Sequence, residues 1–259
     1  MSGKSSIEWT NATWNPVTGC SRVSAGCDAC YAFALHDRRH ACYVANEGRW
    51  SANGPVMPKQ YALPFSTIQL HPDRLGWPLK EHKPLRVFVN SMSDLFHTQV
   101  PDDYIRQVFA TMRAADWHIF QILTKRPGRL RRLANDLVWA PNIWIGVSIE
   151  TDRFVRRADA LRQVPAAVRF LSCEPLLGPL PSLDLKGIHW VITGGESGPQ
   201  ARPCHADWIR GLRDRCQQAH VAFFHKQWGG RTPKAGGRLL DGRTWDEFPQ
   251  VSRQETLFD

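Results

Sequence analysis

Apolar residues recur along the chain in short runs rich in Val, Ile, Phe and Trp. Runs of strand length that are apolar almost throughout are typical of strands buried on both faces of a sheet. The pattern predicts such strands at residues 85–91, 117–125, 142–150, 168–175, 188–196 and 221–228. A seventh is predicted near residues 7–14, IEWTNATW.

Polar segments with helical spacing lie between these runs. Residues 101–115 (PDDYIRQVFATMRAA) open with Pro and two Asp, and residues 205–220 (HADWIRGLRDRCQQAH) carry apolar residues at three- and four-residue steps. Alternating strands and helices pair in parallel through right-handed crossovers. We therefore predict a single α/β domain over residues 1–259, a full or partial (β/α) barrel of the TIM type. An open doubly wound sheet is the alternative.

Two segments fall outside this alternation. Residues 47–84 contain scattered Pro, Gly and His, and they are too long for a simple loop in a compact domain. We expect a lid or a substrate-binding insertion after the cysteine segment. Residues 229–259 form a C-terminal extension, in which RLLDGRTWDEFP predicts a hairpin around its Asp-Gly turn.

The charge and the cysteines indicate a compartment and a partner. The formal net charge of +9 favours contact with a polyanion, nucleic acid first among them, although solvated helix faces would give the same count. No apolar run reaches the ~18 residues of a membrane span, and the N-terminal residues lack a secretion signal. We expect a cytoplasmic protein, in which the seven cysteines suit metal or redox chemistry better than disulfides.

Polar side chains concentrate where each predicted strand ends. In a parallel barrel these positions share one rim, which is the face that carries active sites. Taken singly, each could also be a turn or cap residue. The set comprises Asn90, Ser91, Ser93, Asp94, Thr124, Lys125, Arg126, Ser148, Glu150, Cys173, Glu174, Thr193, Gly194, Gly195, Glu196, His225, Lys226 and Gln227.

Three cysteines, Cys20, Cys27 and Cys30, lie within eleven positions of one another. Three thiolates favour zinc or an iron-sulfur cluster. A structural zinc site would need a fourth protein ligand, for which His36, His40 and Cys42 are candidates. A [4Fe-4S] cluster needs only three cysteines if its fourth iron binds something exchangeable.

The segment CSRVSAGCDACY resembles the cluster loop of the radical S-adenosylmethionine (SAM) superfamily, in which three cysteines follow the first barrel strand and a helix comes next. It departs from the usual pattern in having six residues between the first two cysteines. Its last cysteine follows Ala29, where an aromatic residue is usual. Further segments, NSMSDLFH, ILTKRP, GVSIE, SCEPLLGP and VITGGESG, resemble a phage-associated three-cysteine-motif family related to these enzymes and without an assigned function.

The resemblance implies cofactors and ligands for them. Cys20, Cys27 and Cys30 would hold a [4Fe-4S] cluster, and SAM would bind its fourth iron. Reduction of the cluster would cleave SAM to methionine and a 5′-deoxyadenosyl radical, which abstracts hydrogen from a substrate. The expected contacts are Ser93 and Asp94 to the amino group of SAM, and Ser148 and Glu150 to its ribose or carboxylate. Gly194, Gly195 and Glu196 could approach its adenine or ribose, although Gly-Gly after a strand is also an ordinary tight turn.

The remaining candidates concern catalysis and substrate. Cys173 could return a hydrogen atom to a substrate radical, or it could be only a small buried hydrophobe. His225 and Lys226 could contact substrate. The basic residues beside the strand ends could hold the phosphates of a DNA or RNA substrate, or they could be solvated. They are Lys125, Arg126, Arg129, Arg131, Arg132, Arg153, Arg156, Arg157 and Arg202.

The favoured function is thus a radical SAM-type enzyme that acts on a nucleic acid, with a flavodoxin- or ferredoxin-like electron donor and a partner protein as a further candidate. A zinc-stabilised, non-catalytic nucleic-acid-binding protein is the main alternative. An electron-transfer iron-sulfur protein is a third, and it would close its cluster with Cys42.

Overall fold

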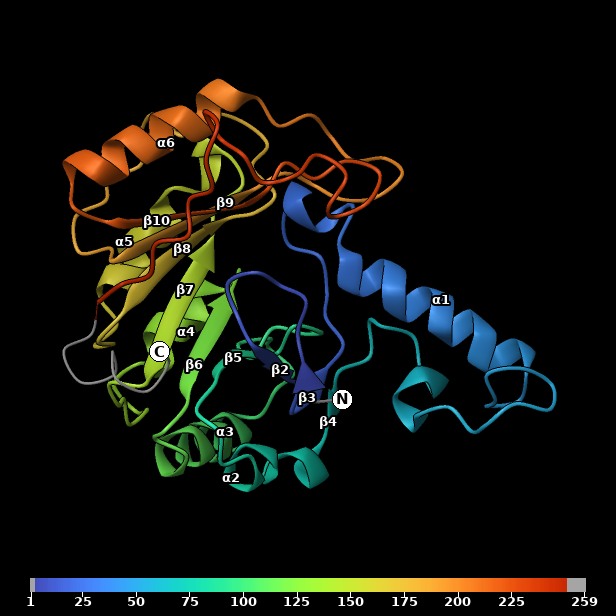
Figure 1. Ribbon diagram of the computed structural model, residues 1–259. Coiled ribbons are helices and arrows are strands. Elements are labelled where there is room, and N and C mark those ends of the chain that lie inside the picture. The colour runs from blue at the N-terminus through green and yellow to red at the C-terminus, as the bar shows by residue number, and fades with distance from the viewer. Residues whose placement is uncertain (1–2, 251–259) are drawn as a thin grey trace.

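All seven predicted strands form in the computed structural model, which describes residues 3–250, and they build one curled sheet (Figure 1). The sheet has eight strands in the order β1-β2-β5-β6-β7-β8-β9-β10. Every neighbouring pair is parallel except β1 with β2. Their bounds are β1 Gly3–Lys4, β2 Ala12–Trp14, β5 Arg86–Val89, β6 Ile119–Thr124, β7 Ile143–Ser148, β8 Arg169–Cys173, β9 Trp190–Gly194 and β10 Ala222–Gln227. Because β1 and β10 are edge strands, the sheet is a half-barrel.

The strand order follows the chain order from β2 to β10. Right-handed crossovers that always advance in one direction place their helices on one face of the sheet, so the doubly wound alternative is wrong. The helices are α1 Tyr31–Ala45, α2 Trp77–Lys80, α3 Asp102–Ala114, α4 Pro127–Leu133, α5 Arg156–Arg162 and α6 Ala206–Gln218. None of them, within residues 3–250, is long and apolar enough to span a bilayer.

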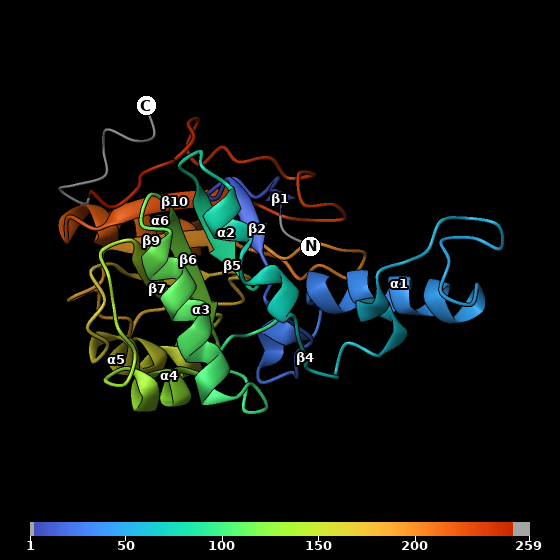
Figure 2. The same ribbon diagram turned by 90° about the horizontal axis from the view of Figure 1, so that it is seen from below.

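The convex face of the sheet packs against α3 to α6, which Figure 2 shows along one side of the strands. In α3 the apolar positions Ile105, Val108, Phe109 and Met112 are buried, as the three- and four-residue spacing predicts. They join the helix-facing side chains of β5, β6 and β7 in the larger of two hydrophobic cores. This core holds β5, β6 and β7 in place from the convex side of the sheet.

The concave face has an apolar part and a polar part. Near the amino ends of the strands it is filled by a second core of mainly aromatic side chains, among them Trp144, Phe170, Trp190 and Phe224. Alternate residues of a strand share one face, so this face continues toward the carboxyl ends with small and polar residues: Gly146, Ser148, Ser172, Glu174, Gly194 and Lys226. We call the carboxyl-terminal ends of β2 and β5 to β10 the mouth.

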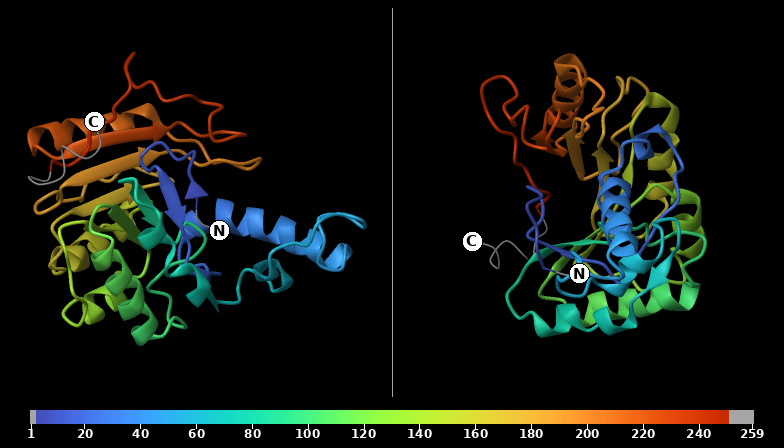
Figure 3. Two further views of the ribbon diagram at one scale, coloured as in Figure 1. Left: turned by 60° about the horizontal axis from the view of Figure 1, so that its bottom comes forward. Right: turned by 90° about the vertical axis from the view of Figure 1, so that its right-hand side faces the viewer.

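The insertion and α1 form an arm that projects from the half-barrel (Figure 3). Residues 47–63 return along α1 and include the 3-10 turn Lys59–Ala62, and two imidazoles join the segments. His36 Nε2 lies 2.9 Å from the Leu63 carbonyl oxygen, and His40 Nδ1 lies 2.8 Å from that of Tyr61. The rest of the insertion pairs β4 (Gln69–Leu70) with β3 (Val17–Thr18) and ends in α2. The other 3-10 turns are Ala25–Cys27, Pro72–Arg74 and Asp152–Phe154.

The predicted C-terminal hairpin is reduced to its turn. Asp241 and Gly242 both have positive φ, of 52° and 80°, as a two-residue hairpin turn requires. Leu240 and Arg243 pair on either side of it in a single antiparallel bridge. The extension instead runs antiparallel to β10, where Asp246 pairs with Phe224. Residues 251–259 of the predicted extension lie outside the described residues.

Gly146 supplies a test of the concave core. A Cβ at this position would lie 2.4 Å from the Phe170 ring, so Gly146→Ala should overpack the core and lower the free energy of unfolding by about 1–3 kcal/mol. Gly211 is the matched control, because it is exposed within α6 and a Cβ there meets nothing within 4 Å. Gly211→Ala should raise stability by up to about 1 kcal/mol. Urea denaturation of both variants measures the difference, and equal effects would contradict this account of the core.

Candidate functional site

Residues 19–30, the cysteine loop, run from β3 to α1 across the mouth. Gly19 begins the loop with φ of +94°, and a Cβ at this position would lie 2.1 Å from the Thr67 carbonyl oxygen. Its amide donates to the Met92 carbonyl at 3.0 Å, and the Cys20 amide donates to the Phe65 carbonyl at 2.9 Å. Only glycine combines this backbone conformation with so close an approach. The first cysteine is thereby fixed to both β5 and the insertion.

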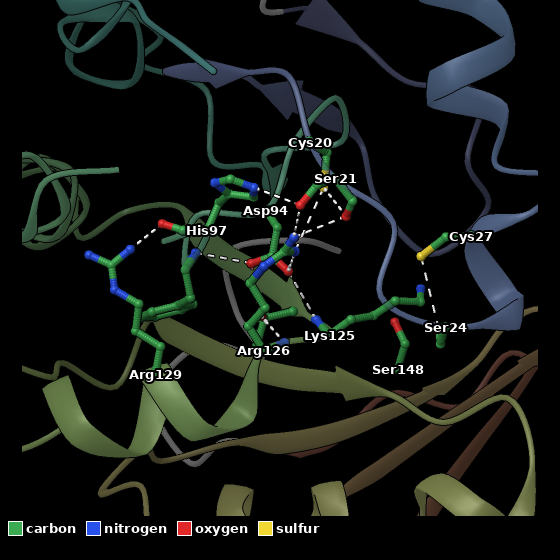
Figure 4. A network of polar contacts seen from close by, with 12 residues as sticks. Cys20, Ser21, Ser24, Cys27, Asp94, His97, Lys125, Arg126, Arg129 and Ser148 are labelled. Atoms are coloured by element: carbon green, nitrogen blue, oxygen red, sulfur yellow. Dashed lines mark hydrogen bonds and ion pairs between the residues drawn. The ribbon is translucent and has the colours of Figure 1, made fainter. Parts of the chain in front are cut away.

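Arg126, at the end of β6, holds the first turn of the loop (Figure 4). Its guanidinium donates to the carbonyl and the hydroxyl of Ser21, each at 2.9 Å, and lies 3.7 Å from Cys20 Sγ. It also pairs with Asp94 Oδ2 at 2.9 Å. His97 Nε2 lies 2.8 Å from the Ser21 hydroxyl. These contacts make a continuous network from the end of β5 to Cys20.

Asp94 is buried, with 5% of its surface exposed. Its Oδ1 accepts from the Phe96 amide at 3.0 Å and from the Thr124 hydroxyl at 2.7 Å. Its Oδ2 accepts from the Lys125 amide at 3.1 Å in addition to Arg126. Asp94 therefore serves to orient Arg126 and to tie β5 to β6.

Glu150, just beyond β7, supports the middle of the loop. It has no exposed surface, and its carboxylate accepts from the Ser24 hydroxyl at 2.6 Å and pairs with Arg157 at 2.9 Å. Lys125 Nζ lies 3.7 Å away. A Cβ at Gly26 would lie 2.4 Å from Glu150 Cγ. The loop can rest on this carboxylate because Gly26 has no side chain.

Arg202, which follows β9, holds the last part of the loop. Its guanidinium makes two hydrogen bonds to Glu196, at 2.6 and 2.9 Å, and donates to the Ala25 carbonyl at 2.7 Å. Asp28 lies 3.7 Å from it. Burial alone would raise the pKa of Glu196, but the hydrogen bonds and charge of Arg202 outweigh burial and hold it below its usual value. The pair is thus ionised at neutral pH.

The three thiols occupy different positions on this supported loop. Cys27 is buried, with its Sγ 3.9 Å from the Ser24 hydroxyl, whereas Cys20 and Cys30 are partly exposed. Burial first, and then the charge of Asp94, raises the pKa of Cys20 to about 11, against the opposing effect of Arg126. Metal binding at Cys20 must therefore release a proton. Among residues 3–250, no three His, Cys, Asp or Glu side chains converge as ligands of one metal ion would.

The candidate fourth zinc ligands lie on the arm. The rings of His36 and His40 contact the insertion carbonyls described above, and Cys42 Sγ lies 3.3 Å from the Trp50 carbonyl oxygen. Each of these side chains is engaged with the segment that returns along α1. The structure does not bring them to the cysteine loop.

The concave face at the mouth carries an ion pair between Glu174 and Lys226, whose charged atoms lie 2.9 Å apart. Ser172 donates to Glu174 at 3.3 Å, and Gly194 makes room for this carboxylate, since a Cβ there would lie 3.1 Å from Oε2. Ser148 Oγ is buried on the same face and makes no hydrogen bond within the described residues. Sequence reasoning assigned no role to Glu174, although its place at a strand end and its alternation with Ser172 mark it.

Other predicted residues lie away from this pair. Cys173 faces the helices, in the larger core with Cys216, and burial raises its pKa well above the usual value. His225 is fully buried with its Nδ1 3.1 Å from the Thr193 hydroxyl, and burial, followed by the charge of Arg238, lowers its pKa to about 4. It is therefore neutral at physiological pH.

Three further predicted residues, Arg129, Gly195 and Ser93, are explained by packing within the chain. Arg129 bonds the carbonyls of His97 and Val100 and pairs with Asp102. A Cβ at Gly195 would lie 1.9 Å from the Trp228 carbonyl oxygen. Gly195 therefore has a packing role within the chain, because the segments that follow β9 and β10 approach each other closely here. Ser93 donates to the Val17 carbonyl at 3.0 Å.

Residues 4–249 match the family described as "Protein of unknown function (DUF5131)". The chain belongs to this family. No curated protein and no solved structure matches it. The match covers nearly the whole described chain. Because the family is described as one of unknown function, a function has to be argued from the cysteine loop and the mouth.

Glu150 provides the test of how the loop is held. Removing one partner of a buried ion pair leaves an uncompensated charge, which costs about 3–5 kcal/mol. Glu150→Ala should therefore lower the free energy of unfolding by about that amount and increase the rate at which a thiol reagent modifies Cys27. Asp103→Ala is the control, because Asp103 pairs with Arg106 at an exposed position and should cost about 0.2–1 kcal/mol. Unchanged Cys27 reactivity in Glu150→Ala would contradict the supporting role.

Proposed function

We propose that the protein is a radical SAM-type enzyme in which Cys20, Cys27 and Cys30 bind a [4Fe-4S] cluster. The single observation that carries this proposal is the cysteine loop itself: three thiols on one segment, held across the mouth of a parallel half-barrel by Arg126, Glu150 and Arg202. The motifs that resemble the superfamily lie at the strand ends that hold this loop. We also propose that the half-barrel is a partial barrel of the TIM type.

The chemistry of the donors favours a cluster over a single zinc ion. Thiolates on zinc lie about 2.3 Å from one ion and must converge on it, whereas the cysteines of a [4Fe-4S] cluster bind separate irons. The expected fourth ligands His36, His40 and Cys42 are engaged on the arm. The zinc-stabilised alternative is therefore less well supported.

Cys20, Cys27 and Cys30 would hold the cluster, which, when reduced, would supply the one electron needed for reductive cleavage of SAM. The chain's own contribution is position and shielding from water. Arg126 lies against the Cys20 sulfur, where its charge favours a thiolate. Asp94 and Glu196 orient the arginines that hold the loop.

The residues left to contact SAM are those of the concave face. Ser148 has a hydroxyl without a partner among the described residues, and it could bond a ribose hydroxyl or a carboxylate. Glu174 and Lys226, with side chains 13% and 20% exposed, offer one charge of each sign. In this proposal Asp94, Glu150 and Glu196 contribute chiefly by positioning the cysteine loop. Cys173 takes no part in it.

The first test is the metal content of protein purified without oxygen. We expect a brown protein with about four irons and four sulfides per chain. Cys20→Ala, Cys27→Ala and Cys30→Ala should each lose them. Cys42→Ala is the matched control and should keep the cluster, because Cys42 lies on the arm. A colourless protein with stoichiometric zinc would overturn the proposal, and loss of iron in Cys42→Ala would favour the electron-transfer alternative.

The second test concerns SAM. The reduced protein should release 5′-deoxyadenosine from SAM, detected by chromatography. Ser148→Ala should weaken SAM binding by up to about tenfold, the value of one hydrogen bond, without loss of iron. Ser51→Ala, in an exposed turn of the arm, should bind SAM normally. Equal affinities in the two variants would remove Ser148 from the cofactor site.

A further inference from the structure

The carboxylates at the mouth are neutralised within the chain. Asp94 pairs with Arg126, Glu150 with Arg157, Glu174 with Lys226 and Glu196 with Arg202, all at 2.6–2.9 Å. Four acidic groups and four basic groups are thereby used up inside the molecule. The potential outside the mouth is consequently set by the charges that remain exposed.

Four exposed arginines lie on the helical layer, on α4, on α5 and in the turn between β7 and α5. Arg131 and Arg132 lie in the last turn of α4, Arg153 lies in the turn after β7, and Arg156 begins α5. The helices α4 and α5 lie side by side (Figure 2). We call these four residues the cation patch.

The cation patch has almost no internal partners. Within residues 3–250 the guanidinium groups of Arg131, Arg132 and Arg156 make no hydrogen bond or ion pair, and Arg153 only approaches the Phe154 ring at 5.9 Å. Arg210 and Arg213 on α6, by contrast, are both paired with Asp241. Unpaired guanidinium groups that share one surface are suited to phosphate, which they bind through a planar pair of N–H donors.

An exposed aromatic ring stands at the mouth itself. Tyr31 begins α1 directly after Cys30 and is 52% exposed. Its hydroxyl donates to the Ser91 carbonyl at 2.6 Å, which fixes the ring against the end of β5. A fixed, accessible ring is a platform on which an unpaired base can stack.

From these observations we propose that the cation patch binds the phosphate backbone of single-stranded nucleic acid, with a base of the strand stacked on Tyr31 at the mouth. Single-stranded substrate is favoured because a base inside a duplex cannot reach the mouth without being flipped out. That this strand is the substrate of the enzyme rests on the radical chemistry proposed above. Phosphate binding by the cation patch does not depend on it.

The test is the salt dependence of binding to a fluorescent single-stranded oligodeoxynucleotide, measured by anisotropy from low to physiological salt. Each phosphate contact contributes about 0.7 to the slope of log K against log salt for a single strand. The triple variant Arg131→Gln, Arg132→Gln, Arg156→Gln should therefore bind with a slope shallower by about 2.

A matched triple variant controls for net charge. Lys80→Gln, Lys83→Gln, Arg113→Gln removes the same three charges from exposed positions before β5 and β6, at the opposite end of the strands. It should keep the slope of the unaltered protein. Tyr31→Ala should weaken binding at every salt concentration without changing the slope, whereas Tyr31→Phe should retain the affinity.

Three outcomes would overturn the proposal: no binding at low salt, the same loss of slope in both triple variants, or displacement of the oligonucleotide by polyglutamate as readily as by unlabelled strand. Iron content is measured on the same preparations. Protein that binds the strand but holds no cluster would retire the radical chemistry and leave the cation patch standing. Protein that holds the cluster but does not bind the strand would overturn the proposed role of the cation patch and leave the radical chemistry standing.

Discussion

The mouth of the half-barrel depends on carboxylates that are removed from water and paired with arginine. Asp94, Glu150 and Glu196 are each at most 5% exposed, and a carboxylate buried in this way is tolerated only when it is paired and hydrogen-bonded. The arginines that pair with Asp94 and Glu196 reach onward to the cysteine loop, and Glu150 contacts it directly. The ion pairs at the strand ends therefore also position the cysteine loop.

Backbone approach complements these charges. The loop reaches Glu150 only because Gly26 has no side chain, and β9 and β10 pass each other only because Gly195 has none. A methyl group at either glycine would fall within the contact radius of a neighbouring atom. Side chains support the loop from the strand ends, and glycines decide how closely the backbone can come to them.

The aromatic filling of the concave face has a further consequence. Trp144, Phe170 and Trp190 occupy the amino-terminal half of the strands, so the accessible polar groups are confined to the carboxyl-terminal half. Any chemistry of the protein is thereby restricted to the few side chains between this aromatic layer and the cysteine loop. Such a site is shielded from water from below by packing and from above by the loop, which suits reactive intermediates.

The sequence by itself determined the strands, their parallel order and the edge of the sheet at which polar groups meet. Buried parallel strands are apolar along their whole length, so β5 to β10 stand out within a few residues of their observed ends. The two clearest helices, α3 and α6, follow from the spacing of their apolar positions. The cysteine spacing likewise identified the loop, since thiols so close in sequence are close in space in any fold.

Only the tertiary structure decided how the charges are used. Arg126, Arg132 and Arg157 look alike in the sequence, yet the first holds Cys20 and Ser21 and the third neutralises Glu150, whereas the second has no partner among residues 3–250. The same holds for Cys173, whose side of β8 depends on register. Pairing of this kind joins residues up to 177 positions apart, as Ala25 and Arg202 are. A long-range electrostatic partner leaves no periodic signal in a single chain, because its distance in space is set by the packing of the sheet and not by its position in the sequence.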